Sequence, residues 1–424
     1  MRLFRELVTA ENLKKTLPSA AVGAGVGAAV TGTAVAGGAG VAAYFARQVV
    51  VPPKRPVENV KILAVGYDSY AEQLTGQPTS VRLPASLVTV APGEYGLYFN
   101  GGQSFAVLGE VLAYHPDDNS VVRRVNVVRS GDLAVAARAR ISGSVYRTPE
   151  EAGYVADDVS LELEVGSAPA WVVHPQAALE GQRPSSSATP DDSATWAIMV
   201  HGMGSTRAET LRALEATQRL GMTSLHISYR TDREAPSAED GRYGLGFTEW
   251  EDVDTAIAYA LDHGARDVVL FGWSMGAAIC LQAMDRGRYR DRIRAMVLDG
   301  PAVDWLNLIQ YHGQLNKIPL RIGQLGVSMI STPALNFFTG LKRPIDLGKL
   351  SWTRRPEDIS VPTLIIHSLD DTFVPPSSSQ ELAEKSPLVD FVAFHGASHT
   401  REWNVDPKRW RDTVVEWLSP RLSS

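Results

Sequence analysis

The sequence predicts an α/β protein: a mostly parallel β-sheet flanked by helices over residues 194–424, preceded by a β-rich region. After Ala194, apolar runs alternate with helical stretches, which is the pattern of parallel strands joined by crossover helices. Before residue 175, short β-branched runs are separated by turn residues, as in antiparallel hairpins. A chain of 424 residues with 44% hydrophobic residues is long enough for two folded units.

The N-terminal 57 residues are expected to hold a membrane anchor. Residues 16–46 carry no charge, and a membrane helix needs about 20 apolar residues. Seven glycines in this run leave a flexible linker or a cleaved signal peptide as alternatives. We expect a transmembrane helix at about residues 17–46, in a single-pass protein of the cell membrane whose catalytic body lies outside the cytoplasm.

Charge and cysteine content exclude several classes of partner. Residues 1–57 have a formal charge of +5 and the remainder −11, so the acidic body argues against nucleic acid as a partner. The single cysteine, Cys280, cannot form an internal disulfide, and no Cys/His spacing of the kind that zinc sites use is present. We expect no metal and no cofactor, and the sequence leaves the oligomeric state open.

Residues 58–175 are predicted to form a β-rich domain of unknown role, and residues 176–193, rich in Ser, Pro and Asp, a linker. The strands expected in this domain are Val60–Val65, Val81–Val90, Tyr95–Phe99, Ser104–Leu108, Val121–Val128 and Val159–Val165.

The C-terminal region, residues 194–424, is predicted to be the catalytic domain. Its expected strands are Thr195–Val200, Thr223–Tyr229, Asp267–Phe271, Ala295–Leu298, Thr363–His367 and Val389–Phe394, and its expected helices are Arg207–Leu220, Trp250–Leu261, Met275–Met284, Ser377–Lys385 and Lys408–Leu418. The apolar segment 303–349 interrupts this alternation. We interpret it as a small helical cap, with a plain crossover helix and loop as the alternative.

A candidate nucleophile lies in Gly272-Trp273-Ser274-Met275-Gly276, directly after the apolar run 268–271 and before the helical residues 277–281. This strand–turn–helix context is what a nucleophile elbow requires. Gly272 and Gly276 would let the strand and helix pass closely, and the helix N-terminus would face a developing oxyanion. The alternative is that Ser274 is only a turn residue.

Two strand ends downstream supply a candidate base and acid, because a serine hydroxyl is a poor nucleophile without them. His399 lies five residues beyond its strand, far enough for the imidazole to reach Ser274, whereas His395 stands at the strand end. Asp371 is the predicted acid; its neighbour Asp370 is expected to cap or to face solvent. Asp299, at the end of another strand, is the rival acid. The carboxylate would fix the tautomer of the histidine.

A second loop, His201-Gly202-Met203-Gly204, follows the first strand of the sheet. We expect His201 and Gly202 to support this loop structurally. The backbone N–H of Met203 would then pair with that of Met275 to form an oxyanion hole.

As a set, these motifs resemble the α/β-hydrolase superfamily over Ala194–Leu422, including Asp371-x-x-Val374-Pro375 and Gly396-Ala397-Ser398-His399. The chain is most similar to prolyl-oligopeptidase-like and serine-aminopeptidase-like bacterial hydrolases. The resemblance implies an eight-stranded core, with one or two strands supplied before residue 194, and hydrolysis of an ester, thioester or amide. Ala277 stands where many relatives have glycine. Residues 58–170 replace the propeller of true prolyl oligopeptidases, which argues against a peptidase.

Four functions are therefore compared. The leading hypothesis is a serine esterase acting on a small-molecule or lipid acyl substrate through an acyl-enzyme intermediate. A serine peptidase and an acyltransferase need the same three side chains. The alternative from another class is a membrane-tethered, non-catalytic binding scaffold.

Overall fold

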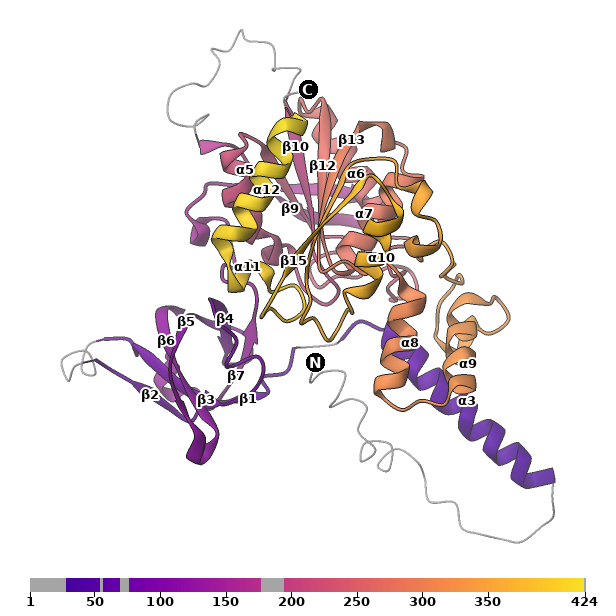
Figure 1. Ribbon diagram of the computed structural model, residues 1–424, viewed down its shortest axis with the longest axis horizontal. Helices are drawn as coiled ribbons and strands as arrows, with labels where there is room; N and C mark the ends of the chain where they lie inside the picture. Colours follow the sequence, from indigo (N-terminus) through magenta and orange to yellow (C-terminus); the bar gives the residue numbers. More distant parts are fainter. Residues whose placement is uncertain (1–27, 54–55, 69–75, 177–193, 423–424) are drawn as a thin grey trace.

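The structure is a computed structural model that describes residues 28–53, 56–68, 76–176 and 194–422 (Figure 1). Two β-sheets dominate these parts of the chain. The larger has eight strands and carries most of the core, and the smaller has seven strands. Figure 1 shows the smaller sheet beyond one edge of the larger one, with helices α3, α8 and α9 beyond the same edge.

The eight-stranded sheet has the order β15-β14-β13-β12-β10-β11-β9-β8. Six of its strands are parallel: β10 (Thr195–Val200), β11 (Thr223–Ile227), β12 (Asp267–Trp273), β13 (Ile293–Asp299), β14 (Thr363–Ser368) and β15 (Val389–Phe394). All of them except the edge strand β15 are buried along most of their length. Strands covered on both faces need continuous apolar runs, which explains their near-unbroken apolar sequences.

Helices cover both faces of this sheet. Helices α6 (Trp250–Asp262), α7 (Met275–Arg286) and α10 (Ser377–Lys385) pack on one face, and α5 (Leu214–Arg219) and α12 (Pro407–Leu422) pack on the other (Figure 1). The helix expected over 207–220 is split, because residues 207–213 form a 3₁₀ segment before α5.

Two antiparallel strands, β8 (Asp157–Leu163) and β9 (Gly166–Val173), complete the eight-stranded sheet. The β-rich domain expected over 58–175 is therefore divided between the two sheets. The apolar residues Leu161, Ala170 and Val172 join the core that contains Leu225 of β11, and burial of this hairpin against β11 is what assigns it to the larger sheet. Most of the expected linker, residues 177–193, lies outside the described residues.

The seven-stranded sheet is antiparallel throughout, in the order β1-β7-β4-β5-β6-β3-β2. Its strands are β1 (Val60–Lys61), β2 (Ala64–Gly66), β3 (Ser80–Pro84), β4 (Tyr95–Phe99), β5 (Ser104–His115), β6 (Ser120–Ser130) and β7 (Arg138–Ser142). The strand expected over Val81–Val90 ends at Pro84, because the Thr89 hydroxyl turns back to donate to the Pro84 carbonyl.

Asn404, in the short helix α11 (Glu402–Val405), fixes the smaller sheet to the larger unit. Its side-chain amide donates to the carbonyls of Glu94 (2.6 Å) and Gly143 (2.9 Å), and its own carbonyl accepts from the Glu94 backbone N–H at 3.2 Å. These three bonds hold the ends of β4 and β7 beside the loop that contains His399.

The expected cap and the expected membrane helix pack together. Helices α8 (Trp305–Leu315) and α9 (Leu320–Ser331) form the cap, and α3 (Ala28–Val50) runs along α9 (Figure 1). Ala42, Ala46 and Val50 of α3 are buried, and a Cβ added at Gly326 of α9 would lie 3.3 Å from the Ala42 carbonyl oxygen. Small residues on both helices allow this close approach.

The anchor expected over residues 17–46 is not supported by its described part. Among helices in the described ranges, none combines the length and apolar character needed to cross a membrane. Four glycines between residues 28 and 50 reduce the apolar character of α3. Residues 17–27 lie outside the described residues.

Candidate active site

Ser274 occupies a strained turn between β12 and α7. Its backbone has φ 52° and ψ −113°, a conformation that a residue with a Cβ rarely adopts and that costs about 1–3 kcal/mol. The turn is held on both sides, since the Ser274 N–H donates to the Asp299 carbonyl (3.0 Å) and the Ser274 carbonyl accepts from the Ala302 N–H (3.2 Å). The strain projects the hydroxyl beyond the sheet edge.

The predicted roles of the flanking glycines have a direct steric basis. A Cβ at Gly276 would lie 2.1 Å from the Val200 carbonyl oxygen and 2.5 Å from that of His201. A Cβ at Gly272 would lie 2.6 Å from the Cα of Ala277. Both contacts involve backbone atoms, which cannot move aside as a flexible side chain can.

We therefore expect Gly276→Ala to destabilise the protein by about 1–3 kcal/mol or more, as overpacking against a rigid neighbour does. Gly323→Ala in α9 is the matched control, because a Cβ there meets no atom within 4 Å and alanine is favoured in a helix by roughly 0.5–1 kcal/mol. Thermal unfolding of the two variants measures the difference. An equal melting temperature for both would contradict the steric argument.

The structure brings Ser274, His399 and Asp371 together, although they are far apart in the sequence. His399 Nε2 lies 2.8 Å from Ser274 Oγ, and His399 Nδ1 lies 2.7 Å from Asp371 Oδ2. Asp371 follows β14, His399 follows β15, and Ser274 follows β12. Parallel strands present their carboxyl ends at one edge, which is why these residues meet there.

The Asp371 carboxylate is buried and strongly hydrogen-bonded. Burial alone would raise its pKa, but the charge of His399 and hydrogen bonds from His367 and His399 outweigh burial and hold the pKa well below its usual range. Its Oδ1 accepts the backbone N–H groups of Phe373 (2.7 Å) and Val374 (3.0 Å). Asp371 is therefore a fixed anion at neutral pH.

The side chains of His395 and Asp299, the alternatives to His399 and Asp371, do not take part in the hydrogen bonds that join Asp371, His399 and Ser274. The His395 side chain is 71% exposed, 3.8 Å from Asp370, and Asp370 accepts the backbone N–H of Gly396 at 2.7 Å. Asp299 is buried and accepts from Trp410 Nε1 at 2.7 Å. Burial raises the pKa of Asp299 and of Glu402, its hydrogen-bonding neighbour. Among the described residues, Asp299 makes no hydrogen bond to His399.

His201 stabilises the loop after β10 from its buried side. Its Nε2 lies 2.9 Å from Asp232 Oδ2, its Nδ1 lies 2.9 Å from the Gly202 carbonyl, and its ring stacks on Tyr229. Burial would lower the pKa of His201, but the hydrogen bond and charge of Asp232 outweigh it and raise the pKa. The Gly202 N–H donates to Glu209 at 2.9 Å.

The backbone N–H groups of Met203 and Met275 are the predicted oxyanion donors. Met275 is the first residue of α7, where helical N–H groups lack an internal partner. In the described ranges neither N–H donates to an acceptor of the protein. Both are therefore available to a ligand, and Met203 and Ser274 line the same cavity.

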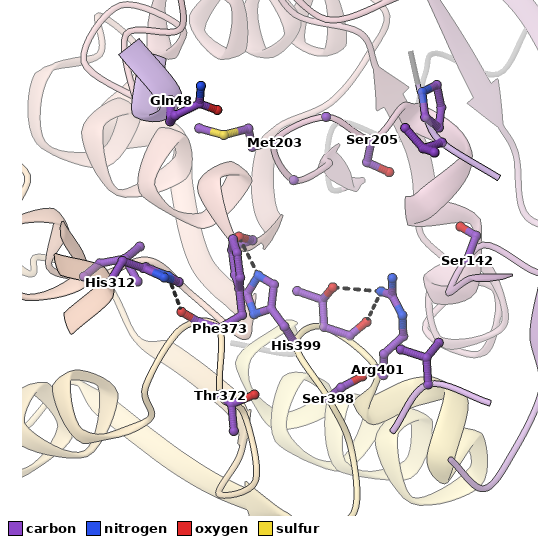
Figure 2. A pocket seen from close by; sticks show the side chains of 18 of the residues that line it. Gln48, Ser142, Met203, Ser205, His312, Thr372, Phe373, Ser398, His399 and Arg401 are labelled. Carbon is purple, nitrogen blue, oxygen red and sulfur yellow. Dashed lines mark hydrogen bonds between the residues drawn. The ribbon is translucent and has the colours of Figure 1, made fainter. Parts of the chain in front are cut away.

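A cavity of about 1350 Å³ opens over Ser274 and His399. Its apolar lining comes from α3, α8, α9 and the loop 86–92, and includes Phe45, Val49, Leu308, Ile309, Ile322, Ile330, Leu87 and Val90. Its polar lining includes Arg140, Arg233 and Arg401. In Figure 2, His312 and Phe373 lie on one side of His399, and Arg401 and Ser142 lie on the other.

Three residues that support Asp371 and His399 were not predicted from the sequence. His367 on β14 reaches Asp371 Oδ2 with Nε2 (3.2 Å) and lies near Ser379 Oγ with Nδ1 (2.9 Å). His312 of α8 reaches the Phe373 carbonyl with Nε2 (2.9 Å), and the Phe373 ring lies 5.0 Å from the His399 ring. The sequence offered one clue to the role of His367, which is its position four residues before Asp371. The residues around His312 and Phe373 in the sequence gave no such clue.

The described residues contain no group of three or more His, Cys, Asp and Glu side chains that could hold a metal ion. Cys280 is buried in α7, and burial raises its thiol pKa. The groups gathered at the cavity include the Ser274 hydroxyl and the His399 imidazole, which suit nucleophile and base chemistry.

The larger unit also matches a known family. Residues 197–413, just over half of the chain, match the alpha/beta hydrolase family. The chain belongs to this family. It is therefore a hydrolase with the alpha/beta hydrolase fold, and the match does not single out the prolyl-oligopeptidase-like or serine-aminopeptidase-like branches. Residues 70–142 of this alpha/beta hydrolase match a domain of unknown function (DUF8805).

Several solved structures are similar to this alpha/beta hydrolase. An esterase from Pyrococcus furiosus (Pf2001) is 18% identical, with 65% of this chain and 96% of that chain covered and a TM-score of 0.46. Est1E from Butyrivibrio proteoclasticus, solved with ferulic acid bound, is 14% identical over 63% and 100%, with a TM-score of 0.46. An alpha-beta serine hydrolase homologue from Coxiella burnetii is 17% identical over 62% and 97%, with a TM-score of 0.39.

Proposed function

We propose that this alpha/beta hydrolase cleaves carboxylic esters, with Ser274 as nucleophile, His399 as general base and Asp371 as the acid that orients the base. The observation that carries the proposal is the unbroken series of contacts from Asp371 Oδ2 through His399 to Ser274 Oγ, with distances of 2.7 and 2.8 Å. Such distances permit proton transfer without rearrangement.

In the proposed reaction His399 Nε2 takes the Ser274 hydroxyl proton while Oγ attacks the ester carbonyl carbon. The negative charge on the carbonyl oxygen is stabilised by the N–H groups of Met203 and Met275. Collapse breaks the bond to the alcohol, which leaves with the proton from His399, and forms an acyl-Ser274 ester. Water then attacks the acyl carbon and gives a proton to His399. Collapse breaks the bond to Ser274 Oγ, which takes this proton back from His399, and the acid is released. Asp371 stabilises the imidazolium in both halves.

The shape and lining of the cavity favour an ester with an extended apolar acyl group. Its volume of about 1350 Å³ exceeds the roughly 300–1,000 Å³ of ordinary small-ligand sites. Leu308 and Ile309 of α8 and Ile330 of α9 line it on the cap side. Tyr311 OH and His312 Nε2 tie α8 to the acid loop through the carbonyls of Thr372 and Phe373, so the apolar wall is fixed beside His399.

A fluorophosphonate probe tests the proposal, since it reacts covalently with activated serines. The wild-type protein should be labelled at one site, Ser274→Ala should not be labelled, and Ser205→Ala should label normally. Ser205 is the matched control because it lines the same cavity but has no part in the proposed reaction. Labelling that persists in Ser274→Ala, or a folded wild-type protein that does not label, would overturn the proposal; the latter result would favour a binding scaffold.

A substrate series separates the ester from the amide. We expect p-nitrophenyl octanoate to be cleaved with a higher kcat/KM than p-nitrophenyl acetate, because the longer chain reaches the apolar wall. Faster cleavage of aminoacyl p-nitroanilides than of either ester would favour a peptidase instead.

A further inference from the structure

Three arginines from separate parts of the chain line the cavity beside the reacting groups. Arg140 lies on β7 of the smaller sheet, Arg233 lies in the loop after β11, and Arg401 follows His399 by two residues. They are close enough to act on one another: after burial, which is the largest cause, the charges of Arg233 and Arg401 lower the pKa of Arg140.

Arg140 lacks the partner that a half-buried guanidinium normally has. It lies over the Tyr98 ring, 4.4 Å from the ring centroid, and it makes no hydrogen bond or ion pair to any residue that the structure describes. After burial, the Tyr98 phenol has the largest influence on the pKa of Arg140 and raises it, and the influence of the Glu58 carboxylate is weaker than that of either arginine. Desolvated charges are usually paired, so this group is suited to an anion that enters from the cavity.

Arg401 and Arg233 are each held in place beside the catalytic loops. Arg401 donates to the Thr400 carbonyl (2.9 Å) and hydroxyl (3.0 Å). A Cβ at Gly143 would lie 2.5–2.7 Å from the Arg401 guanidinium, so this glycine lets the side chain rest against the end of β7. Arg233 donates to the Gly204 carbonyl at 2.8 Å, on the loop that carries Met203.

The two acidic side chains that line the cavity do not neutralise Arg140. Glu209 accepts the Gly202 N–H and lies 3.6 Å from Arg212 and 3.9 Å from Arg401. Asp370 accepts the Gly396 N–H. Glu209 is therefore shared between Arg212 and Arg401, and Asp370 is engaged by Gly396. Neither carboxylate pairs with Arg140, so the positive charge near Arg140 remains in excess.

We propose that the alcohol portion of the ester carries an anionic group, a carboxylate or a phosphate, which Arg140 binds with Arg233 and Arg401 across His399 from the apolar cap. This inference rests on the proposed esterase function. Figure 2 shows the two sides that the substrate would span, with His312 on one side of His399 and Arg401 on the other. An apolar acyl chain would lie against α8 and α9, and the charged alcohol would lie against β7.

Matched synthetic esters test this substrate class. The probes are the octanoyl esters of 4-hydroxybenzoate (carboxylate), of 4-hydroxyphenyl phosphate (phosphate) and of methyl 4-hydroxybenzoate (neutral). Because charge-assisted, bidentate hydrogen bonds are the strong ones, we expect the wild-type protein to favour at least one anionic ester over the neutral ester by about tenfold or more in kcat/KM. The larger preference identifies the anion.

Variants assign the preference to the arginine. Arg140→Gln should reduce the anionic-to-neutral ratio of kcat/KM to within about threefold, and Arg140→Lys, which keeps the charge but not the bidentate geometry, should retain an intermediate ratio. Arg138→Gln, two residues away on the same strand and exposed, should keep the wild-type ratio. Circular dichroism establishes that each variant is folded.

The outcomes separate this inference from the proposed function. Ser274-dependent hydrolysis of the neutral ester, with a wild-type ratio near one or a ratio unchanged in Arg140→Gln, would overturn the anionic substrate and leave the esterase proposal standing. Absence of hydrolysis of all three esters, together with absence of fluorophosphonate labelling, would overturn both.

Discussion

Replacing Ser274 with alanine is expected to lower the turnover number for p-nitrophenyl octanoate by roughly 10⁴-fold or more. The substitution removes the oxygen that His399 Nε2 contacts at 2.8 Å, so no acyl-enzyme can form. The residual rate would come from the free N–H groups of Met203 and Met275 and from substrate binding. Steady-state kinetics with the Ser205→Ala variant as control measures the effect.

This test is informative because alanine preserves the local backbone. The left-handed φ of 52° at position 274 is equally strained for serine and alanine, so the melting temperature should stay close to that of the wild type. A loss of activity with an unchanged melting temperature assigns the effect to the hydroxyl. A Ser274→Ala variant that retains more than about a tenth of the wild-type rate would exclude the proposed nucleophile.

The second large effect is expected for Asp371→Asn, with a loss of about 10⁴-fold in the turnover number. An asparagine amide cannot accept as the carboxylate does at both His367 Nε2 and His399 Nδ1. It would favour the tautomer of His399 that carries its proton on Nε2, which cannot accept the Ser274 proton. The measurement is kcat at a single neutral pH.

Asp299→Asn is the matched control for the acid. Asp299 is also a buried carboxylate at a strand end, but it accepts from Trp410 and hydrogen-bonds to Glu402. We expect this variant to keep a turnover number within about tenfold of the wild type, since it makes no contact with His399. The reverse order of the two losses would transfer the acid role to Asp299.

The large sheet was predictable because burial on both faces demands continuous apolar runs. Thr195–Val200 has the bounds in the structure that its sequence suggests. The β8–β9 hairpin was not assignable in the same way, since its alternating pattern fits an edge of either sheet. The resemblance to the superfamily implied that one or two strands of the larger sheet precede residue 194, but not which ones. The pairing of β9 with β11 and the packing of Leu161 and Val172 against Leu225 identify them as β8 and β9.

Helix α3 shows how one composition can fit two different environments. An uncharged run rich in Ala, Gly and Val fits a membrane, but it also fits close packing of two helices. In the described part of the chain, Ala42 and Ala46 are buried against α9 next to Gly326. The determinant is a complementary small-residue surface more than 280 residues away in the sequence.

The positions of Ser274, Asp371 and His399 could be predicted because each lies in the turn or loop that follows a parallel strand. The arginines could not. Arg140 lies in Arg138-Ala139-Arg140-Ile141, where alternating arginines on a strand are typical of a solvated face. Its place in the cavity depends on how β7 is seated beside α11, which is a property of the assembled molecule.

Asn404 joins the smaller sheet to the helix that begins three residues after His399. The smaller sheet supplies Arg140 to the cavity, and it is attached to the larger unit both by these bonds and by a shared apolar core that includes Phe105 of β5 and Trp403 of α11. Substitutions in β7 or in the loop 86–92 can change which substrates bind in the cavity, while Ser274, His399 and Asp371 stay unchanged. During evolution, such an enzyme can acquire new substrates through substitutions in the part of the cavity lining that the smaller sheet provides.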